Sequence, residues 1–303
     1  MKLEGIFPAT ILPMKADFSI DLESYEKYIQ WMLSFPIGGL AINVDTGEGF
    51  QLTREEQRAV VKKTAEVVKK KVPIIAGVTG GYTKQAVIHA QDAEECGADA
   101  LLIFSPPVFS GKVPPKRIAL TYYQDIARAV NIPLVIFQLS GEFGGVEFSQ
   151  DTLLKLIEME GVTGIKEASF NIRHFQETLS VLRAASEEIS ILTGNDHFIF
   201  ESFLLGADGG LLGLSSMSPG LHVDLFNAVQ KKEYDLALQL RDKIQLLAHT
   251  IYARPFRHYR TRAKEALVLQ KVIPAAHVRP PLLPISREEV NHIADILTQV
   301  ELI

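Results

Sequence analysis

Short runs of β-branched and other apolar residues recur along the chain at regular intervals and predict buried strands. The runs lie at residues 5–12, 39–43, 72–78, 100–104, 133–137, 162–166, 189–193 and 209–214. Between them lie segments with the spacing of amphipathic helices, the clearest being Tyr25, Tyr28, Ile29, Met32 and Leu33. The segment Thr53-Arg54-Glu55-Glu56 has the pattern of a capping box, which predicts the start of the second helix.

Alternation of apolar strands with helices predicts a parallel α/β sheet, because parallel strands need crossover helices and are buried on both faces. Eight such units in 303 residues predict a (β/α)8 TIM barrel. After residue 214 the strand pattern ends, and helical patterns cover about 221–256, 259–269 and 286–303. We therefore expect residues 1–220 to hold the barrel strands and most barrel helices. Residues 221–303 would form the last barrel helix and a C-terminal helical extension, as one structural unit with the barrel.

The composition indicates a globular protein that acts on small molecules. Apolar residues make up 47% of the chain, and the net charge of −5 offers no basic surface for nucleic acid or anionic membranes. Cys96 is the single cysteine, so an intramolecular disulfide is impossible and a reducing compartment fits. The sequence shows no secretory or lipidation signal and no apolar stretch of about 18 residues. We expect a cytoplasmic protein.

Lys166 ends the apolar run 162–166 and is the most informative residue of the chain. Strand geometry places Val162, Gly164 and Lys166 on one face, where Gly164 leaves room for a long side chain. Burial would lower the pKa of the lysine and free its amine to attack a carbonyl, forming an imine. The same pattern also fits a solvated lysine at the start of a loop.

In a barrel of this kind the active site lies at the C-terminal ends of the strands. Lys166 is the only lysine among the positions that this rule selects. The others are Asp45, Thr46, Gly47, Glu48, Thr79, Ser105, Phe137, Gln138, Glu167, Asn195, Asp196, His197, Ser215 and Ser216. Polar residues at strand-to-helix turns also cap helices, so each of these positions has that second interpretation.

Four segments together resemble the dihydrodipicolinate synthase/N-acetylneuraminate lyase family, and the resemblance covers essentially the whole chain. They are Asp45-Thr46-Gly47-Glu48, Gly164-Ile165-Lys166-Glu167-Ala168, Thr193-Gly194-Asn195-Asp196 and Arg279-Pro280-Pro281-Leu282-Leu283-Pro284. The resemblance implies a (β/α)8 barrel with a C-terminal helical extension. It also implies a Schiff base between Lys166 and pyruvate or a related 2-oxo acid. No metal and no cofactor are expected, and the other expected partners are further copies of the chain, in a tetramer or dimer.

The resemblance also assigns substrate contacts. The turn Asp45, Thr46 and Gly47 would hold the substrate carboxylate through backbone N–H groups and the Thr46 hydroxyl. Phe137 and Leu211 are predicted to contact substrate as well.

Several residues depart from the family pattern, and two of them bear directly on the chemistry. Phe137 occupies the position of the tyrosine that relays protons in the family, and a phenyl ring cannot transfer a proton. Glu142 falls where the dihydrodipicolinate synthases have an arginine that binds a second carboxylate, so it would repel their anionic aldehyde. We expect Asp45 or a bound water to carry the protons instead.

The expected function is a class I lyase, an aldolase or dehydratase in sugar-acid or related catabolism rather than lysine biosynthesis. A catalytically impaired barrel that binds a 2-oxo acid as a sensor or scaffold is one alternative. A genuine 4-hydroxy-tetrahydrodipicolinate synthase is another.

Two further features have mainly structural interpretations. His197 is a candidate substrate contact, although a buried or helix-start role is favoured. The basic run from Arg254 to Lys264 is predicted to be a solvated or interface face rather than an anion site.

Overall fold

The eight predicted strands are all present and form one parallel sheet in the computed structural model, which describes residues 1–110 and 113–303. The strands are β1 (Gly5–Pro8), β2 (Leu40–Ile42), β3 (Ile74–Val78), β4 (Ala100–Ile103), β5 (Leu134–Leu139), β6 (Val162–Ala168), β7 (Ser190–Thr193) and β8 (Gly209–Leu212). Strands β2 to β8 pair in sequence order, and β1 pairs with β8. A parallel bridge between Ala9 and Ala41 links the ends of β1 and β2, so the sheet nearly closes. The predicted TIM barrel is confirmed.

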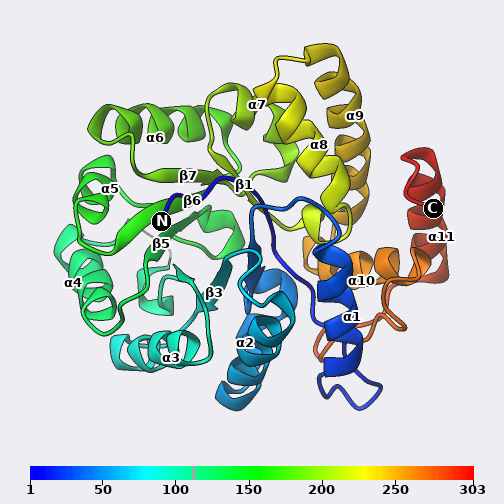
Figure 1. Cartoon of the computed structure of the whole chain (residues 1–303), viewed down its shortest axis with the longest axis horizontal. Helices are drawn as coiled ribbons and strands as arrows, with labels where there is room; N and C mark the ends of the chain where they lie inside the picture. Colours follow the sequence, from blue (N-terminus) through cyan, green and yellow to red (C-terminus); the bar gives the residue numbers. More distant parts are fainter. Residues whose placement is uncertain (111–112) are drawn as a thin grey trace.

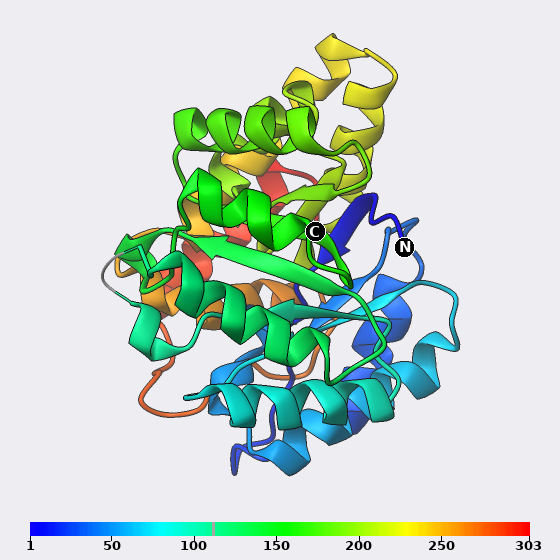
Figure 2. The ribbon, with the colours of Figure 1, turned by 90° about the vertical axis from the view of Figure 1, so that its left-hand side faces the viewer.

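A helix follows each strand and covers the outside of the barrel (Figures 1 and 2). These helices are α1 (Leu22–Met32), α2 (Arg54–Val68), α3 (Thr83–Glu95), α4 (Lys116–Ala127), α5 (Gln150–Ile157), α6 (Ile172–Ala185), α7 (Ile199–Leu204) and α8 (Pro219–Gln230). The capping box before α2 is confirmed, because the Thr53 side chain accepts from the Glu56 N–H and the Glu56 side chain accepts from the Thr53 N–H.

Two apolar layers hold the barrel together. One lies between the strands and the surrounding helices, and it includes Ile165 of β6. The other fills the barrel interior, where Val135, Leu192 and Leu211 are fully buried. Because side chains alternate along a strand, Lys166 faces the interior side next to Ile165 and lies at the mouth of this second layer.

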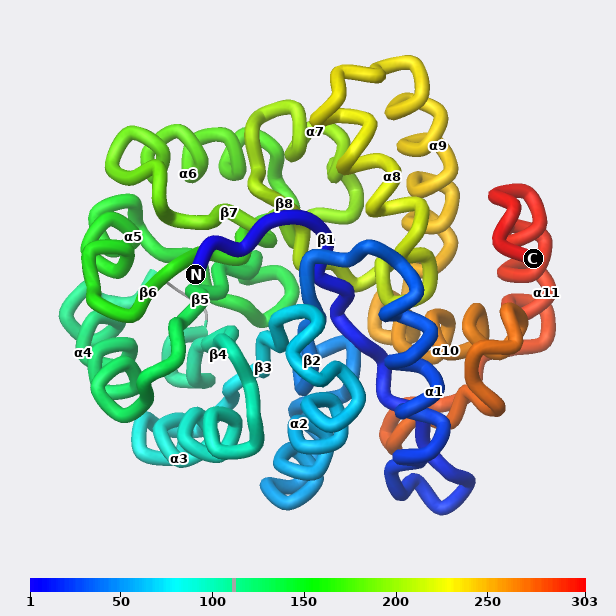
Figure 3. Tube along the Cα trace, in the orientation of Figure 1, coloured from blue at the N-terminus to red at the C-terminus, as the bar shows by residue number. Residues whose placement is uncertain are grey.

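Three helices continue beyond the barrel: α9 (Tyr234–Ile251), α10 (Tyr259–Leu269) and α11 (Arg287–Gln299). The sequence predicted one helical stretch over 221–256, but α8 and α9 are separate helices with a turn at Lys232, whose φ is 61°. Figure 3 shows α11 at the outer edge, and it packs against α9 and α10. Among the described residues, no helix is both long and apolar enough to cross a membrane.

Candidate active site

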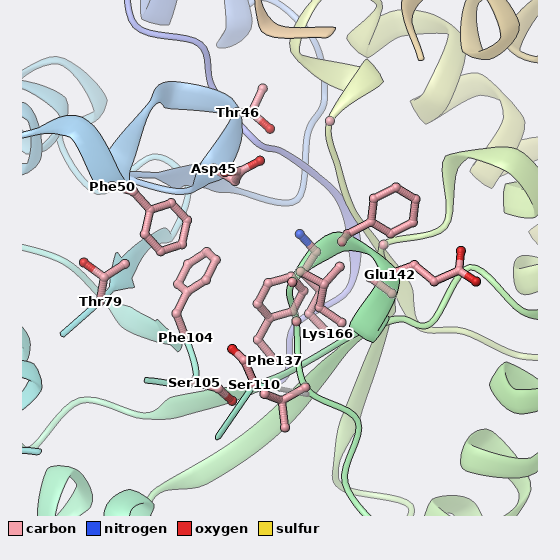
Figure 4. A pocket seen from close by; sticks show the side chains of 18 of the residues that line it. Asp45, Thr46, Phe50, Thr79, Phe104, Ser105, Ser110, Phe137, Glu142 and Lys166 are labelled. Carbon is pink, nitrogen blue, oxygen red and sulfur yellow. The ribbon is translucent and has the colours of Figure 1, made fainter. Parts of the chain in front are cut away.

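A cavity of about 610 Å³ opens at the C-terminal ends of the barrel strands. It brings together Asp45, Thr46, Phe137 and Lys166 from the predicted site (Figure 4). Gly47 is buried in the turn below Asp45, and Leu211 lies fully buried deeper in the barrel. The structure therefore places four of the six predicted site residues on the cavity wall.

Lys166 and Phe137 are paired in register on the neighbouring strands β6 and β5. The Lys166 Nζ lies 4.5 Å from the centroid of the Phe137 ring. Burial lowers the pKa of Lys166 to about 8, although the carboxylates of Asp196 and Asp45 act in the opposite direction. A substantial fraction of the amine is therefore uncharged near neutral pH, as an imine-forming nucleophile requires.

Gly194, rather than Gly164, makes room for the lysine. A Cβ at Gly194 would lie 2.8 Å from the Lys166 Cε, whereas a Cβ at Gly164 would meet the backbone and side chain of Ser190. The role assigned to Gly164 from strand alternation was therefore wrong. The space depends on the turn after β7, which the pattern within β6 cannot reveal.

Asp45 begins the short helix η1 (Asp45–Gly47) after β2 and has polar partners from the start of α10. Its carboxylate accepts from the Tyr259 hydroxyl at 2.6 Å and from the guanidinium of Arg260. The Arg260 Nε also donates to the Asp45 carbonyl at 2.7 Å. Burial, reinforced by the charge of Asp45, raises the pKa of Tyr259 well above its ordinary value. Asp45 thus lies in a network with a phenol, which is the kind of group that Phe137 lacks.

Asp196 forms a second carboxylate–phenol pair, on the opposite side of Lys166 in the strand order. It accepts from the Tyr252 hydroxyl at 2.8 Å. Its other oxygen lies 3.8 Å from the Nε2 of His222, and within the described chain neither atom has a hydrogen-bond partner. The His222 Nδ1 contacts the carbonyl of Ser218 at 2.8 Å and must donate to it.

Asn195 joins the turns after β6 and β7 instead of capping the next helix. Its amide nitrogen donates to the Glu167 carboxylate at 2.8 Å, and its oxygen accepts from the Phe170 N–H at 2.8 Å. Burial raises the pKa of Glu167. Asn195 and Glu167 therefore fix the strand end that carries Lys166 from the side facing away from the cavity.

Arg254 and Arg257 in the basic run are exposed, as predicted, but the solvated interpretation was wrong for the three basic residues within α10. Arg260, Arg262 and Lys264 are each less than 10% exposed and pair with acidic residues far away in the sequence. Lys264 pairs with Glu48, and both side chains are fully buried. Local charge patterning could not show these pairs, because each partner is at least 27 residues away.

His197 is exposed and does not line the cavity; its ring stacks on Tyr252 at a centroid distance of 5.6 Å. Glu142 does line the cavity and is exposed. The functional residues that the sequence interpretation missed are Tyr252, Tyr259 and Arg260. The sequence indicated these residues only as part of an aromatic and basic segment around the start of the helix predicted over 259–269.

The chain is thus a (β/α)8 barrel with a buried lysine of lowered pKa at the end of β6, on the wall of a cavity at the barrel mouth. A model of the Dihydrodipicolinate synthetase family matches residues 2–300, and the chain belongs to this family. It is thus a lyase of the dihydrodipicolinate synthase type.

Individual relatives agree with this assignment. A 4-hydroxy-tetrahydrodipicolinate synthase of Neisseria meningitidis serogroup B is 31% identical over 94% of each chain. The structure of dihydrodipicolinate synthase from Thermotoga maritima has a TM-score of 0.91 at 24% identity and covers 100% of both chains. The enzyme from Acinetobacter baumannii, solved in complex with pyruvate, has a TM-score of 0.88 at 26% identity and also covers 100% of both chains.

Proposed function

We propose that the protein is a class I lyase in which Lys166 forms a Schiff base with pyruvate or another 2-oxo acid. The observation that carries the proposal is the position of Lys166 at the cavity wall with a pKa lowered to about 8. The similar enzyme from Acinetobacter baumannii was solved with pyruvate, which supports the choice of 2-oxo acid.

In the proposed reaction, the uncharged amine of Lys166 attacks the keto carbon, and loss of water gives a protonated imine. The imine withdraws electrons from the neighbouring carbon, so removal of a proton there gives an enamine. This enamine attacks a carbonyl carbon in the condensation direction and is the leaving fragment in the cleavage direction.

The substrate carboxylate is expected at the turn after β2. Thr46 lines the cavity there, whereas the Gly47 N–H already donates to the Val44 carbonyl at 3.1 Å. We therefore assign the carboxylate contact mainly to Thr46, with Gly47 shaping the turn: a Cβ at this glycine would lie 2.8 Å from the Thr10 carbonyl oxygen.

Asp45 is proposed to carry protons together with Tyr259. The hydrogen bond of 2.6 Å between them lets a proton move between phenol and carboxylate beside the substrate. Arg260 keeps Asp45 in place and offsets its negative charge, which would otherwise repel the substrate carboxylate.

Two alternatives remain distinct from this proposal. A genuine 4-hydroxy-tetrahydrodipicolinate synthase is favoured by the names of relatives and opposed by Glu142 and Phe137. A sensor or scaffold that binds a 2-oxo acid without turnover is favoured by Phe137 alone. The expected oligomer, a tetramer or dimer, is also a proposal, which light scattering of the purified chain would test.

Exchange of the pyruvate methyl protons in D2O tests the proposed function. Enamine formation should replace these protons by deuterium, so their NMR signal should disappear in the presence of the protein. The Lys166→Ala variant should leave the signal unchanged, whereas a variant of an exposed lysine, Lys155→Ala, should behave as the unchanged protein. A sensor that forms the imine without proton transfer would give no exchange.

A further inference from the structure

Three phenylalanine rings form a row along one wall of the cavity, leading to Lys166 (Figure 4). The centroids of Phe50 and Phe104 are 5.0 Å apart, and those of Phe104 and Phe137 are also 5.0 Å apart. Both pairs are edge-to-face, and Phe137 in turn contacts the Lys166 Nζ. A substrate joined to the lysine would therefore extend along this row.

A second aromatic group lines another part of the same cavity. Phe143 lies 4.7 Å from Phe170 and 4.7 Å from Phe256, measured between ring centroids. Phe256 continues to Tyr252 and Tyr259, each at 5.4 Å. The cavity wall thus holds six phenylalanines, each from a different turn or strand.

Core packing does not explain the outermost rings. Phe104 and Phe137 are less than 10% exposed and also contribute to the barrel interior, but Phe50 is 53% and Phe143 is 37% exposed. Large aromatic side chains at the mouth of a cavity, open to solvent, indicate a surface that an apolar ligand covers.

Neutral polar side chains also line the cavity beside the phenylalanine row, namely Thr79, Gln85, Ser105 and Ser110. Among the described residues, the charged side chains that line this outer region are Glu142 and Arg257, and both are exposed. The Ser105 Oγ is buried and has no hydrogen-bond partner within the described chain. A polyhydroxylated fragment would lose hydrogen bonds to water wherever it lies against the phenyl rings.

We propose that the carbonyl substrate condensed with, or released from, the 2-oxo acid is an apolar aromatic aldehyde whose ring binds between the two phenylalanine groups. This inference rests on the proposed Schiff-base function and specifies its second substrate. It replaces the sugar-acid fragment expected from the sequence. An aromatic ring gains edge-to-face and offset contacts with such walls beyond its burial.

The reaction balances without a redox partner. The enamine π-electron pair forms the new bond to the aldehyde carbon, the aldehyde oxygen takes a proton, and the nitrogen lone pair restores the protonated imine. Water then hydrolyses the imine, which releases a 4-aryl-4-hydroxy-2-oxo acid and regenerates Lys166. Loss of water from this acid would give the conjugated arylidene 2-oxo acid, and the reverse sequence is cleavage.

The test compares kcat/KM for benzaldehyde and glyceraldehyde at saturating pyruvate, with products measured by chromatography. We expect benzaldehyde to be favoured at least about tenfold, as contacts with one or two aromatic pairs would give. Phe50→Ala should lower this ratio about fivefold. Phe18→Ala, a phenylalanine that is 38% exposed and lies outside the cavity, should leave the ratio unchanged.

Binding to the Lys166→Ala variant separates this inference from the proposed function. Benzylidenepyruvate, followed by its absorbance, should bind at least about tenfold more tightly than pyruvate. Proton exchange on pyruvate combined with a preference for glyceraldehyde would overturn the aromatic substrate and leave the Schiff-base function standing. Absence of proton exchange on pyruvate would overturn the Schiff-base function. The affinity of Lys166→Ala for benzylidenepyruvate would then test the aromatic site by itself. An affinity no higher than that for pyruvate would contradict the aromatic site.

Discussion

The Lys166 amine lies beside the phenyl ring of Phe137, and this neighbour affects which groups can transfer protons near the lysine. A phenyl ring beside the Nζ supplies no hydrogen bond, and burial at this place disfavours the ammonium form. The family pattern has a hydroxyl at this position, so the proton transfers have to use other groups. Asp45 with Tyr259, and Asp196 with Tyr252, place two phenols on the same cavity wall.

The rate of imine formation should depend on pH through Lys166. Only the uncharged amine attacks the keto carbon, so the rate should rise as pH increases through about 8 and level off above that value. At pH 7 roughly a tenth of the amine would be reactive, since one pH unit is a factor of ten. The initial rate of borohydride-dependent inactivation by pyruvate, measured from pH 6 to 9, checks this. A flat profile would show that the amine is already uncharged or does not react.

Asp45→Asn should lower turnover of the true substrate about 100-fold or more, because general acid–base groups commonly contribute that much. The amide keeps the shape and an acceptor for Tyr259 and Arg260, but it cannot take up a proton. Circular dichroism and thermal unfolding would confirm that the variant is folded. Nearly full activity would assign Asp45 to positioning the turn and transfer the proton role to Tyr252 or water.

At the scale of elements, α10 contacts the turn after β2 and holds it in place. Arg260 contacts Asp45, and one helical turn later Lys264 pairs with Glu48. Lys264 also donates to the His277 carbonyl at 2.7 Å, and Glu48 accepts from the Arg279 N–H at 3.0 Å. The extension beyond the barrel therefore shapes the turn after β2 directly.

Removing one member of the buried Glu48–Lys264 pair should strongly destabilise the protein. Lys264→Met would leave an uncompensated buried carboxylate and should reduce the free energy of unfolding by about 3–5 kcal/mol, whereas the double variant with Glu48→Gln should recover part of this loss. Urea unfolding measures both. Lys155→Met, which breaks an exposed pair with Glu158, should change stability by less than about 1 kcal/mol. Equal losses in the buried and exposed variants would contradict the structural role of α10.

At the scale of the whole molecule, periodicity alone predicted all eight strands and the barrel. The C-terminal ends of all parallel strands in a barrel lie at the same mouth. The sequence could therefore predict that Lys166, Asp45 and Phe137 lie in one cavity. The contributions of Tyr259 and Arg260 could not be predicted, because they lie more than 200 residues from Asp45 and no local pattern shows that contact. The aromatic lining of the cavity could not be predicted for the same reason, because its rings come from separate segments of the chain.

The cavity as a whole should not support condensation of pyruvate with aspartate semialdehyde. Glu142 at the cavity wall repels the carboxylate of that aldehyde, and the phenylalanine walls do not bind it. A coupled assay with the downstream reductase measures this reaction. A kcat within tenfold of a typical value of about 10 per second would support the dihydrodipicolinate synthase alternative.

Reduction by borohydride in the presence of pyruvate tests the central claim most directly. The reduced imine is a stable secondary amine, so digestion and mass spectrometry identify the lysine that carried it. We predict a single pyruvate-derived adduct on the peptide that contains Lys166, dependent on both pyruvate and borohydride and lost in Lys166→Ala. An adduct on another lysine, or none with any 2-oxo acid tested, would contradict the account.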